Sequence, residues 1–499
     1  MAQVQAVVIN PGDSVAVALQ ALPAGCEIVL AGQRLKVLDD VPRGHKVALT
    51  ALSEGAPVIK YGYPIGHARQ AIARGAHVHT HNVATNLSGT KSYVYEPAGP
   101  AVLAAGTGEF AGYERADGQV GIRNELWIIP TVFCVNHLCE ELRAYAQTRL
   151  ADFPGVEACL ALTHPYGCSQ MGEDQATTQR VLAALTRHPN AGAVLVVGLG
   201  CENNNLQVFR PLLEADDPRL AFLNAQDEED ELSAGKALVD RLLAQAGTAT
   251  RTSQPLSRLR IGLKCGGSDG LSGITANPLI GRVSDLVVSA GGTAVMTEVP
   301  EMFGAEQILM NRARNEGVFT QIVALINDFK EYFRSHGETI AENPSPGNKA
   351  GGITTLEDKS LGCVQKGGRS PVSGVLRYGQ RLSSESTGLQ LLQGPGSDGV
   401  SCSALATAGV HLILFSTGRG TPFGTVVPTL KIATNSDLFA RKGGSWIDFN
   451  AGRAAEGESL DTLSGELLEL VLRTASGTKA AAEKRGVREL LIWKDGVTL

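Results

Sequence analysis

The first hundred residues alternate short apolar runs with turn residues. The apolar runs cover residues 5–9, 26–31, 46–52 and 57–61, and Pro-Gly, Pro-Arg-Gly and Glu-Gly turn signals separate them. Runs of this length bounded by Gly and Pro are typical of strands. The pattern predicts a small β-rich domain over residues 1–95. A Pro-, Gly- and Ala-rich stretch without clear period, residues 96–112, is then expected to be a linker.

Beyond residue 113 the pattern changes to strand-length apolar runs followed by helical periodicity. Residues 159–163 precede a predicted helix over 177–186, and residues 193–199 precede another predicted helix that begins near 205. Alternation of this kind favours parallel sheets covered by helices. The chain is therefore predicted to be α/β, with a Rossmann-like catalytic region of one or two domains, divided here as 113–250 and 251–499.

A glycine stands beside a cysteine at the end of three predicted strands. Cys168, Cys201 and Cys265 each follow an apolar run and precede a helix. Carboxyl ends of parallel strands meet at one edge of a sheet, so the three thiols are expected to project from one edge of one sheet. A fourth Gly-Cys pair ends at Cys363, in a long turn-rich stretch. The alternative is that these cysteines pack as small buried residues.

Residues 259–278, LRIGLKCGGSDGLSGITANP, concentrate polar chemistry in a glycine-rich turn. A cation, a thiol, a carboxylate and hydroxyl groups stand there among residues without bulk. Glycines let a backbone approach a ligand closely, and a turn between a strand and a helix is where α/β sheets place ligands. The stretch predicts a binding site, with an ordinary structural turn as the alternative.

Composition limits the partners. The formal net charge is -6 and the sequence pI is about 6.0, so no basic footprint for nucleic acid or an anionic membrane is expected. No apolar stretch approaches the length of a transmembrane helix, and the amino end does not read as a signal peptide. Nine dispersed cysteines favour reduced thiols over a disulfide framework. We expect a cytoplasmic protein that binds small molecules.

Three histidines alternate along one stretch. His77, His79 and His81 fall at every second position, which places them on one face of a strand. Such a face suits a metal ion or an anionic substrate. The alternative is a solvated edge strand with exposed histidines.

A series of motifs carries a resemblance to a known family. In chain order they are HVHTHN, DGQVGIRN, HPYGCSQ, GLGCENN, KCGGSDGLSGITANP, EVPEMFGAE, NPSPGNKAGGITTLEDKSLGC, GRGTPFG and WIDFNAG. Together they resemble the altronate dehydratase / galactarate dehydratase family over nearly the whole chain. The resemblance implies an SAF-like amino-terminal domain, ferrous iron as activator, a homodimer, and dehydration of a sugar acid to a 2-keto-3-deoxy acid. D-altronate is the expected substrate; galactarate, another hexarate, or sulfite elimination from sulfolactate are the alternatives.

The reaction defines the side chains that the site needs. Removing the proton next to a carboxylate makes a dianionic intermediate, which requires a base, cations, and a Lewis or general acid for the departing hydroxide. The predicted catalytic residues are His164, Lys264, Asp269 and Lys349, with His164 and Lys264 as the candidate bases. The predicted substrate-binding residues are Arg123, Asn203, Ser268, Asn348, Arg419 and Lys431.

The sequence is compatible with two kinds of metal centre. A mononuclear Fe(II) would take histidine, carboxylate and water ligands, whereas the Gly-Cys pairs suit an iron–sulfur cluster; another divalent metal is a further alternative. The predicted ligands are His79, His81, Cys168, Cys201, Cys265 and Cys363. Two other functions compete with the dehydratase: a non-catalytic sugar-acid binding protein, and a nicotinamide enzyme. The nicotinamide enzyme is disfavoured because GLGCEN lacks the GxGxxG spacing.

Overall fold

The computed structural model describes residues 5–30, 32–99, 101–213 and 217–499. Its amino-terminal domain consists of strands, as the turn pattern predicts. An antiparallel sheet has the order β1-β2-β5-β8, a second has the order β6-β7-β9, and β3 pairs with β4. The bounds are β1 (Ala6–Val7), β2 (Val15–Ala18), β3 (Glu27–Leu30), β4 (Gln33–Lys36), β5 (Lys46–Ala48), β6 (Pro57–Lys60), β7 (Tyr63–Ala68), β8 (His77–Val78) and β9 (Val83–Ala84).

The middle of the chain forms a four-stranded parallel sheet with the order β13-β12-β14-β15. Helices α1 and α4 pack on one face, and α2 packs on the other. The bounds are β12 (Glu125–Pro130), α1 (Asn136–Arg149), β13 (Ala158–Ala161), α2 (Gly172–Thr186), β14 (Ala191–Gly198), α3 (Leu206–Phe209), β15 (Leu220–Asn224) and α4 (Glu231–Ala246). A small sheet of β10 (Glu109–Glu114), β11 (Val120–Gly121) and β16 (Thr252–Pro255) lies beside it.

The rest of the chain forms a seven-stranded parallel sheet with the order β19-β20-β18-β17-β21-β22-β23. Its strands are β17 (Arg260–Cys265), β18 (Thr293–Met296), β19 (Val372–Leu376), β20 (Gly388–Leu392), β21 (Leu412–Thr417), β22 (Thr429–Ala433) and β23 (Phe449–Asn450). Its helices are α5 (Ala276–Ser289), α6 (Glu306–Asn311), α7 (Glu316–Ser335), α8 (Pro346–Ala350), α9 (Leu356–Cys363), α10 (Asp398–Thr407), α11 (Ser436–Lys442), α12 (Leu460–Ala475) and α13 (Ala481–Lys484).

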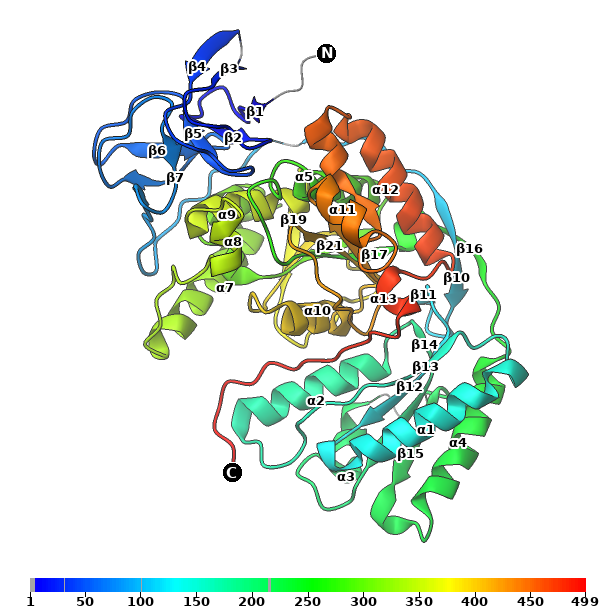
Figure 1. Cartoon of the computed structure of the whole chain (residues 1–499). Coiled ribbons are helices and arrows are strands. Elements are labelled where there is room, and N and C mark those ends of the chain that lie inside the picture. Colours follow the sequence, from blue (N-terminus) through cyan, green and yellow to red (C-terminus); the bar gives the residue numbers. More distant parts are fainter. Residues whose placement is uncertain (1–4, 31, 100, 214–216) are drawn as a thin grey trace.

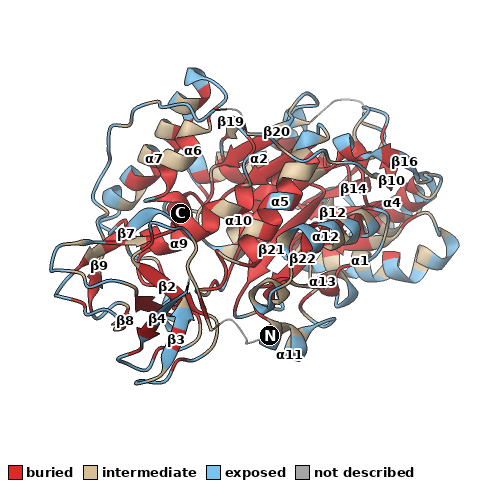
Figure 2. Ribbon diagram, turned by 90° about the horizontal axis from the view of Figure 1, so that it is seen from above, coloured by how far each residue is buried: buried red, intermediate tan, exposed pale blue. Residues whose placement is uncertain are grey.

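The three sheet regions form one connected body (Figure 1). One hydrophobic cluster joins the middle and carboxyl-terminal sheets through residues such as Trp127, Leu182, Leu405 and Phe415. The amino-terminal domain packs against α9, and the carboxyl-terminal segment runs back along α2. Buried residues follow the two parallel sheets and the helix faces that cover them (Figure 2). The sheets thus provide rigid strand ends on which side chains can be positioned.

Two parallel sheets, rather than one, correct the prediction for the cysteines. Cys168 and Cys201 follow β13 and β14 of the four-stranded sheet, whereas Cys265 ends β17 of the seven-stranded sheet. The expectation that all three project from one edge of one sheet was wrong. A repeated strand, Gly-Cys and helix design sets the local surroundings of each thiol, but the sheet that a strand joins depends on pairing with distant strands.

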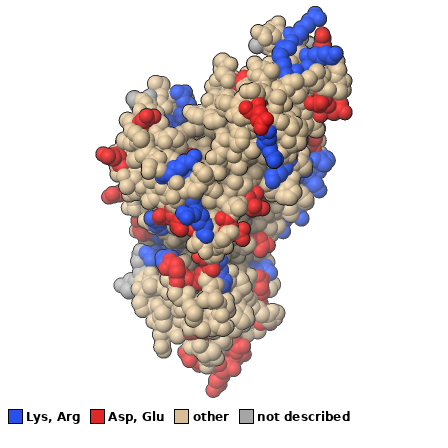
Figure 3. Space-filling model, turned by 90° about the vertical axis from the view of Figure 1, so that its left-hand side faces the viewer, with Lys and Arg blue, Asp and Glu red and all other residues tan. Residues whose placement is uncertain are grey.

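Two surface properties agree with the composition. On the face in Figure 3, Lys and Arg side chains are interspersed with Asp and Glu over most of the surface, so this face has no broad basic patch. In the described part of the chain, every helix is too short or too polar to cross a bilayer.

Candidate functional site

The site is centred on the carboxyl end of β17. Cys265 is the last residue of that buried strand, and Gly266 and Gly267 follow it. A Cβ at Gly266 would lie 2.5 Å from Asp398 Oδ1, and Gly267 has φ of +61°, which favours glycine. The glycines therefore let the start of α10 approach the thiol closely.

Two thiols and a carboxylate converge at this point. Cys265 Sγ lies 3.2 Å from Cys363 Sγ, and Glu301 Oε2 lies 3.2 Å from the first sulfur and 3.1 Å from the second. Cys363 ends α9, and Glu301 lies in the short 3-10 helix after β18. All three residues are buried. Among the described residues, these are the side chains that form a possible metal-ligand group, with ligand atoms within 4.8 Å of one another.

Three buried lysines surround this group. Lys359 Nζ lies 2.8 Å from Glu301 Oε1, and Lys366 Nζ lies 3.1 Å from Cys265 Sγ. Lys264 and Lys366 both pair with Glu298. The Nζ of Lys264 also lies 2.9 Å from Asp398 Oδ1. Cations and carboxylates thus alternate around the two sulfurs, so each buried charge has a partner.

The ion pairs determine the charge states. Burial would raise the pKa of Glu301, but Lys359 and Lys264 lower it below its ordinary value. Burial would lower the pKa of Lys359, but Glu301 raises it. For Lys264, likewise, the effect of Glu298 and Asp398 exceeds that of burial, and the pKa lies well above the ordinary value. A lysine base needs a lowered pKa, so this result argues against Lys264 as the base.

A cleft of about 680 Å³ opens beside the group. Polar side chains and the Gly266 turn line it, with Lys349 exposed at the rim and Lys359 and Glu301 at the buried side. Its charged and amide side chains are Glu301, Glu342, Asn343, Asn348, Lys349, Lys359 and Asp398. A second cavity, of about 710 Å³ between α2, α7 and the carboxyl-terminal segment, has aromatic side chains, four carboxylates and two arginines in its wall. Both arginines pair with a carboxylate of the same wall, Arg180 with Glu173 and Arg377 with Asp328. The first cleft therefore suits an anionic substrate better.

Three predicted residues of the glycine-rich turn and α8 lie beside the cleft. Asn348 lines it, and its amide accepts from Lys359 Nζ at 3.2 Å and donates to the main-chain oxygen of Ser268 at 2.8 Å. Ser268 is buried, and its hydroxyl has no partner among the described residues. Asp269 is half-buried and accepts from Ser272, Thr434 and Asn435. Burial raises its pKa against these hydrogen bonds, and the carboxylate braces the turn.

The predicted histidine ligands belong to a separate cluster. His79 Nδ1 lies 3.1 Å from Thr354 Oγ1, and its ring centroid lies 5.7 Å from that of His77. His81 packs on His77 at 5.3 Å, and His45 Nδ1 lies 3.0 Å from His77 Nε2. Burial lowers the pKa of His79 to about 3. The cluster contacts the segment before α9, but His79 and His81 are not part of the Cys265, Glu301 and Cys363 group.

Four predicted residues lie in the other sheet region. His164, Cys168, Cys201 and Asn203 follow β13 and β14 of the four-stranded sheet. His164 is buried, its Nε2 lies 2.9 Å from the Pro130 oxygen, and its Nδ1 accepts from the Tyr166 N–H. Burial lowers its pKa to about 4. Both ring nitrogens are occupied by the main chain, which argues against His164 as the base.

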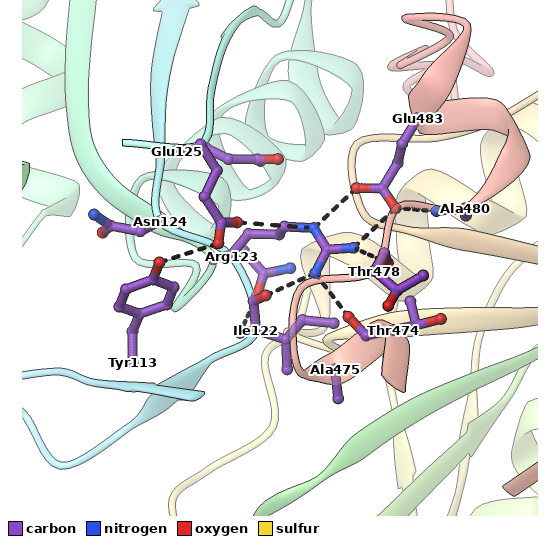
Figure 4. Close-up of polar contacts among 12 residues, drawn as sticks. Tyr113, Ile122, Arg123, Asn124, Glu125, Thr474, Ala475, Thr478, Ala480 and Glu483 are labelled. Atoms are coloured by element: carbon purple, nitrogen blue, oxygen red, sulfur yellow. Dashed lines mark hydrogen bonds and ion pairs between the residues drawn. The ribbon is translucent and has the colours of Figure 1, made fainter. Parts of the chain in front are cut away.

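Arg123 is a structural residue in this fold (Figure 4). Its guanidinium binds both oxygens of Glu483 at 2.9 Å and donates to main-chain oxygens of Ile122, Thr474 and Thr478. The side chain is almost wholly buried. All of its N–H groups are used, so it does not present a cation to a ligand.

The remaining two predicted cations differ in position. Arg419 is exposed, and its main-chain N–H donates to the oxygen of Gly267 at 3.0 Å, which places it beside the turn that lines the cleft. Lys431 donates to the main-chain oxygen of Phe423, and burial lowers its pKa to about 8. Lys431 is absent from the cleft wall.

Five members of the charged group were absent from the predicted site: Glu298, Glu301, Lys359, Lys366 and Asp398. Glu298 and Glu301 follow β18, and a carboxylate directly after a predicted strand was the available signal. Glu298 has φ of 70°, a left-handed conformation unusual for a non-glycine residue. Lys366 follows Cys363 by a turn, and no local pattern marked it.

The donor set fits a divalent metal ion. Two sulfurs and a carboxylate oxygen are ligands that iron and zinc accept, and a substrate oxygen from the adjoining cleft could complete the coordination. An iron–sulfur cluster is a poorer fit at Cys265, because such clusters are held by three or four thiolates and the group here supplies two.

Fold and cleft together define a multidomain α/β protein with a polar, lysine-containing cleft of a size that suits a small molecule. Three family models match the chain: the altronate/galactarate dehydratase SAF domain over residues 4–86, the D-galactarate dehydratase/altronate hydrolase second domain over 112–247, and the D-galactarate/altronate dehydratase C-terminal domain over 256–498. The chain is 51% identical to an altronate dehydratase of Escherichia coli strain K12, with 99% of this chain and 100% of that protein covered.

Two further relatives extend the comparison. An altronate dehydratase of Bacillus subtilis strain 168 is 50% identical, with 98% of this chain and 99% of that protein covered. A galactarate dehydratase (L-threo-forming) of Escherichia coli strain K12 is 34% identical, with 89% and 88% covered. The chain belongs to the altronate/galactarate dehydratase family. It is a hydro-lyase, a carbon–oxygen lyase of the sugar-acid dehydratase class, and the predicted SAF-like amino-terminal domain is confirmed.

Proposed function

We propose that this chain removes water from D-altronate to give a 2-keto-3-deoxy sugar acid. The observation that carries the proposal is the near full-length identity of 51% and 50% to altronate dehydratases, against 34% to the galactarate dehydratase. The cleft supports it, because its lysines suit a carboxylate and its size suits a six-carbon acid. Galactarate or another hexarate is the second candidate.

The cations of the cleft bind and stabilise the substrate carboxylate. Lys359 stays protonated beside Glu301, and Lys349 lies at the open rim. When the proton at C2 leaves, negative charge grows on the carboxylate, and a fixed ammonium stabilises it without reorganisation. Arg419, exposed beside the Gly267 turn, binds the carboxylate from the other side of the turn in this proposal.

Asp398 is the proposed proton acceptor. Its side chain is 39% exposed at the cleft, and its Oδ1 is held 2.9 Å from Lys264 Nζ. The ammonium of Lys264 holds the Asp398 carboxylate in position while that carboxylate takes the proton from C2 of the substrate. Geometry therefore favours Asp398 over Lys264 and His164, whose nitrogens are taken up by neighbouring groups.

Ferrous iron is the proposed activator, with Cys265, Glu301 and Cys363 as its protein ligands. A divalent ion held there would supply Lewis-acid polarisation of a substrate oxygen. Metal analysis of Cys265→Ser and Cys363→Ser proteins tests the assignment, with Cys26→Ser as the matched control because Cys26 lies in the amino-terminal domain. When metal-free protein is loaded with ferrous iron in the absence of sulfide, the two site variants should fail to bind the iron that the control binds. Iron bound by both site variants would exclude this ligand set.

The substrate assignment is tested with a panel of aldonates and aldarates. Keto acid formation is measured with ferrous iron, without nicotinamide, and again after chelation. D-altronate should give a kcat/KM on the order of tenfold or more above that of galactarate, because galactarate carries a second carboxylate where altronate has a hydroxymethyl group, and a site built for the hydroxyl leaves that charge without a partner. A higher kcat/KM for galactarate would make galactarate the substrate instead of D-altronate. If no acid of the panel gave a keto acid, the proposed dehydratase activity would be refuted. A homodimer is also proposed, and light scattering should give twice the chain mass of 52.3 kDa.

A further inference from the structure

A second group of thiols lies at the carboxyl edge of the four-stranded sheet. Strands β13, β12 and β14 are neighbours and run parallel, so their carboxyl ends lie at the same edge. The segment after each strand carries a cysteine: Cys134 after β12, Cys168 after β13, and Cys201 after β14. All three are free thiols, and none belongs to the charged group around Cys265.

Main-chain contacts hold the first two segments together. The N–H of Phe133 donates to the oxygen of Tyr166 at 2.9 Å, so the residue before Cys134 is joined to the residue two positions before Cys168. Gly167 makes this approach possible, because a Cβ there would lie 2.0 Å from a main-chain oxygen just beyond β12. With φ of +99°, Gly167 also adopts a conformation that favours glycine. The Gly-Cys pair therefore brings Cys168 onto the segment of Cys134.

The third segment is held in the same way. The N–H of Asn204 donates to the oxygen of Gly167 at 3.1 Å, and the N–H of Ser169 donates to Asn203 Oδ1 at 3.0 Å. These bonds join the residues that flank Cys168 to those that follow Cys201. The three cysteines thus belong to one hydrogen-bonded set of loops, although they are far apart in sequence.

Two buried amide atoms in these loops have no partner among the described residues. Asn204 is wholly buried and its Oδ1 is unpaired, while its Nδ2 donates to the Thr131 oxygen. Gln170 is 3% exposed and its Nε2 is unpaired, while its Oε1 accepts from Gly167 and Thr178. An unpaired buried donor and acceptor are costly unless a bound group completes them. Inorganic sulfide would accept from the amide N–H.

The ligand chemistry is that of soft sulfur. The nearby carboxylate, Glu202, is already used by Thr131 Oγ1 at 2.6 Å and by the N–H groups of Leu199 and Gly200. The three thiols do not have all ligand atoms within 4.8 Å of one another, as a single ion would need. A cluster with an inorganic core holds its cysteine sulfurs farther apart, because iron and sulfide lie between them. Soft thiolates select such clusters.

We propose that Cys134, Cys168 and Cys201 bind an iron–sulfur cluster with one iron left without a protein ligand. Each thiol gives up its proton on binding iron, and the cluster assembles from two ferrous ions, two ferric ions and four inorganic sulfides, so that no further oxidant is needed. Cys134 and Cys201 are exposed and Cys168 is half-buried, so the fourth iron faces solvent. Its free position takes an oxygen ligand, such as water or a small carboxylate. This centre is separate from the single iron proposed at Cys265.

Anaerobic reconstitution of the full chain with equal amounts of ferrous and ferric iron and with sulfide tests the proposal. Wild type should bind about four sulfides per chain and gain the broad visible absorption of a cubane cluster. A C134S/C168S/C201S protein should lose both, whereas C26S and a C265S/C363S protein should keep both. Unchanged sulfide in the triple variant, or no sulfide in wild type, would overturn the assignment.

Further measurements distinguish loss of the cluster from loss of folding and from loss of the single iron at Cys265. Circular dichroism and thermal unfolding show whether the triple variant is folded, and Cys201→Ser alone, at an exposed position, serves if the triple variant is not. That single variant should bind less sulfide than wild type, and sulfide equal to wild type in a folded Cys201→Ser protein would also count against the proposal. Loss of iron without loss of sulfide in the C265S/C363S protein reports on the catalytic iron alone.

Discussion

Lys46 of the amino-terminal domain and Asp358 of α9 form a wholly buried ion pair, with Nζ 2.7 Å from Oδ2. Lys60 Nζ lies 2.9 Å from the other oxygen of the same carboxylate. Two strands of the first domain thus hold the start of the helix that carries Lys359 and Cys363. The amino-terminal domain is therefore part of the framework of the cleft, since it fixes the helix from which two of the site residues project.

Replacing Asp358 by Asn should destabilise the protein strongly. Two buried ammonium groups would lose their counter-charge, which costs about 3–5 kcal/mol. Denaturant unfolding measures the loss. The matched control is Asp437→Asn, which removes the partner of Arg43 at the surface, where side chains are 31% and 74% exposed, and should cost about 1 kcal/mol or less. Equal effects of the two changes would contradict the structural role given to the buried pair.

The same ion pair predicts a dependence of stability on pH. Burial would raise the pKa of Asp358, but Lys46 and Lys60 lower it below the ordinary value. Its folded-state pKa then lies below that of the unfolded chain, about 4, so the stabilisation is complete above about pH 4 and is lost as pH falls through the folded-state pKa. The stability difference between wild type and Asp358→Asn should shrink in acid. A difference that grows as pH falls would refute the sign.

Lys359→Met should impair turnover, and it should also lower stability, because the buried Glu301 loses a counter-charge. The ammonium lies at the buried wall of the cleft, and its removal takes a fixed positive charge from the developing dianion. We expect kcat/KM to fall by about 10²–10³-fold. Steady-state kinetics on the folded variant, with Lys36→Met as a control at an exposed site, measures the effect. Turnover within twofold of wild type would remove Lys359 from the site.

Local patterns in the sequence predicted strands and the pair of thiols at the site, but they did not predict which strands pair or which side chains form ion pairs. The turn pattern predicted the β-rich first domain, and the Gly-Cys pairs pointed to Cys265 and Cys363, which the fold brings within 3.2 Å. Strand pairing is non-local, so the division into two sheets could not be read from a repeated design. Arg123 looked like a ligand cation because its partner, Glu483, is 360 residues away and nothing local announces it.

His164→Ala should lower stability. The change leaves the Pro130 oxygen and the Tyr166 N–H without a partner, at about 1–3 kcal/mol for each buried group. Burial lowers the pKa of His164 to about 4, below about 6.5 in the unfolded chain. The unfolded chain therefore takes up the proton first, and this residue reduces stability as pH falls from about 6.5 to 4.

The kinetic test of His164 is the pH dependence of kcat/KM. If Asp398 is the base, the acid limb of the profile should keep its position in His164→Ala protein, measured where the variant is folded. Loss of that limb in the variant would restore His164 as the base. The control is His336→Ala, since His336 is an exposed histidine whose ring pairs with Asp495 at the surface.

Arg123→Met should lower stability without changing KM, whereas Arg419→Met should raise KM without changing stability. Arg123 binds both oxygens of the buried Glu483, so its loss leaves a buried carboxylate with less counter-charge and should cost about 3–5 kcal/mol of unfolding free energy. The folded fraction should keep the KM of wild type.

Arg419 is exposed beside the Gly267 turn, so Arg419→Met should change the unfolding free energy by about 0.5 kcal/mol or less and raise KM on the order of tenfold. Thermal unfolding and steady-state kinetics on both variants decide. A stable Arg123→Met protein with a raised KM would return Arg123 to the substrate site, because a residue that only braces the fold has no reason to change substrate affinity.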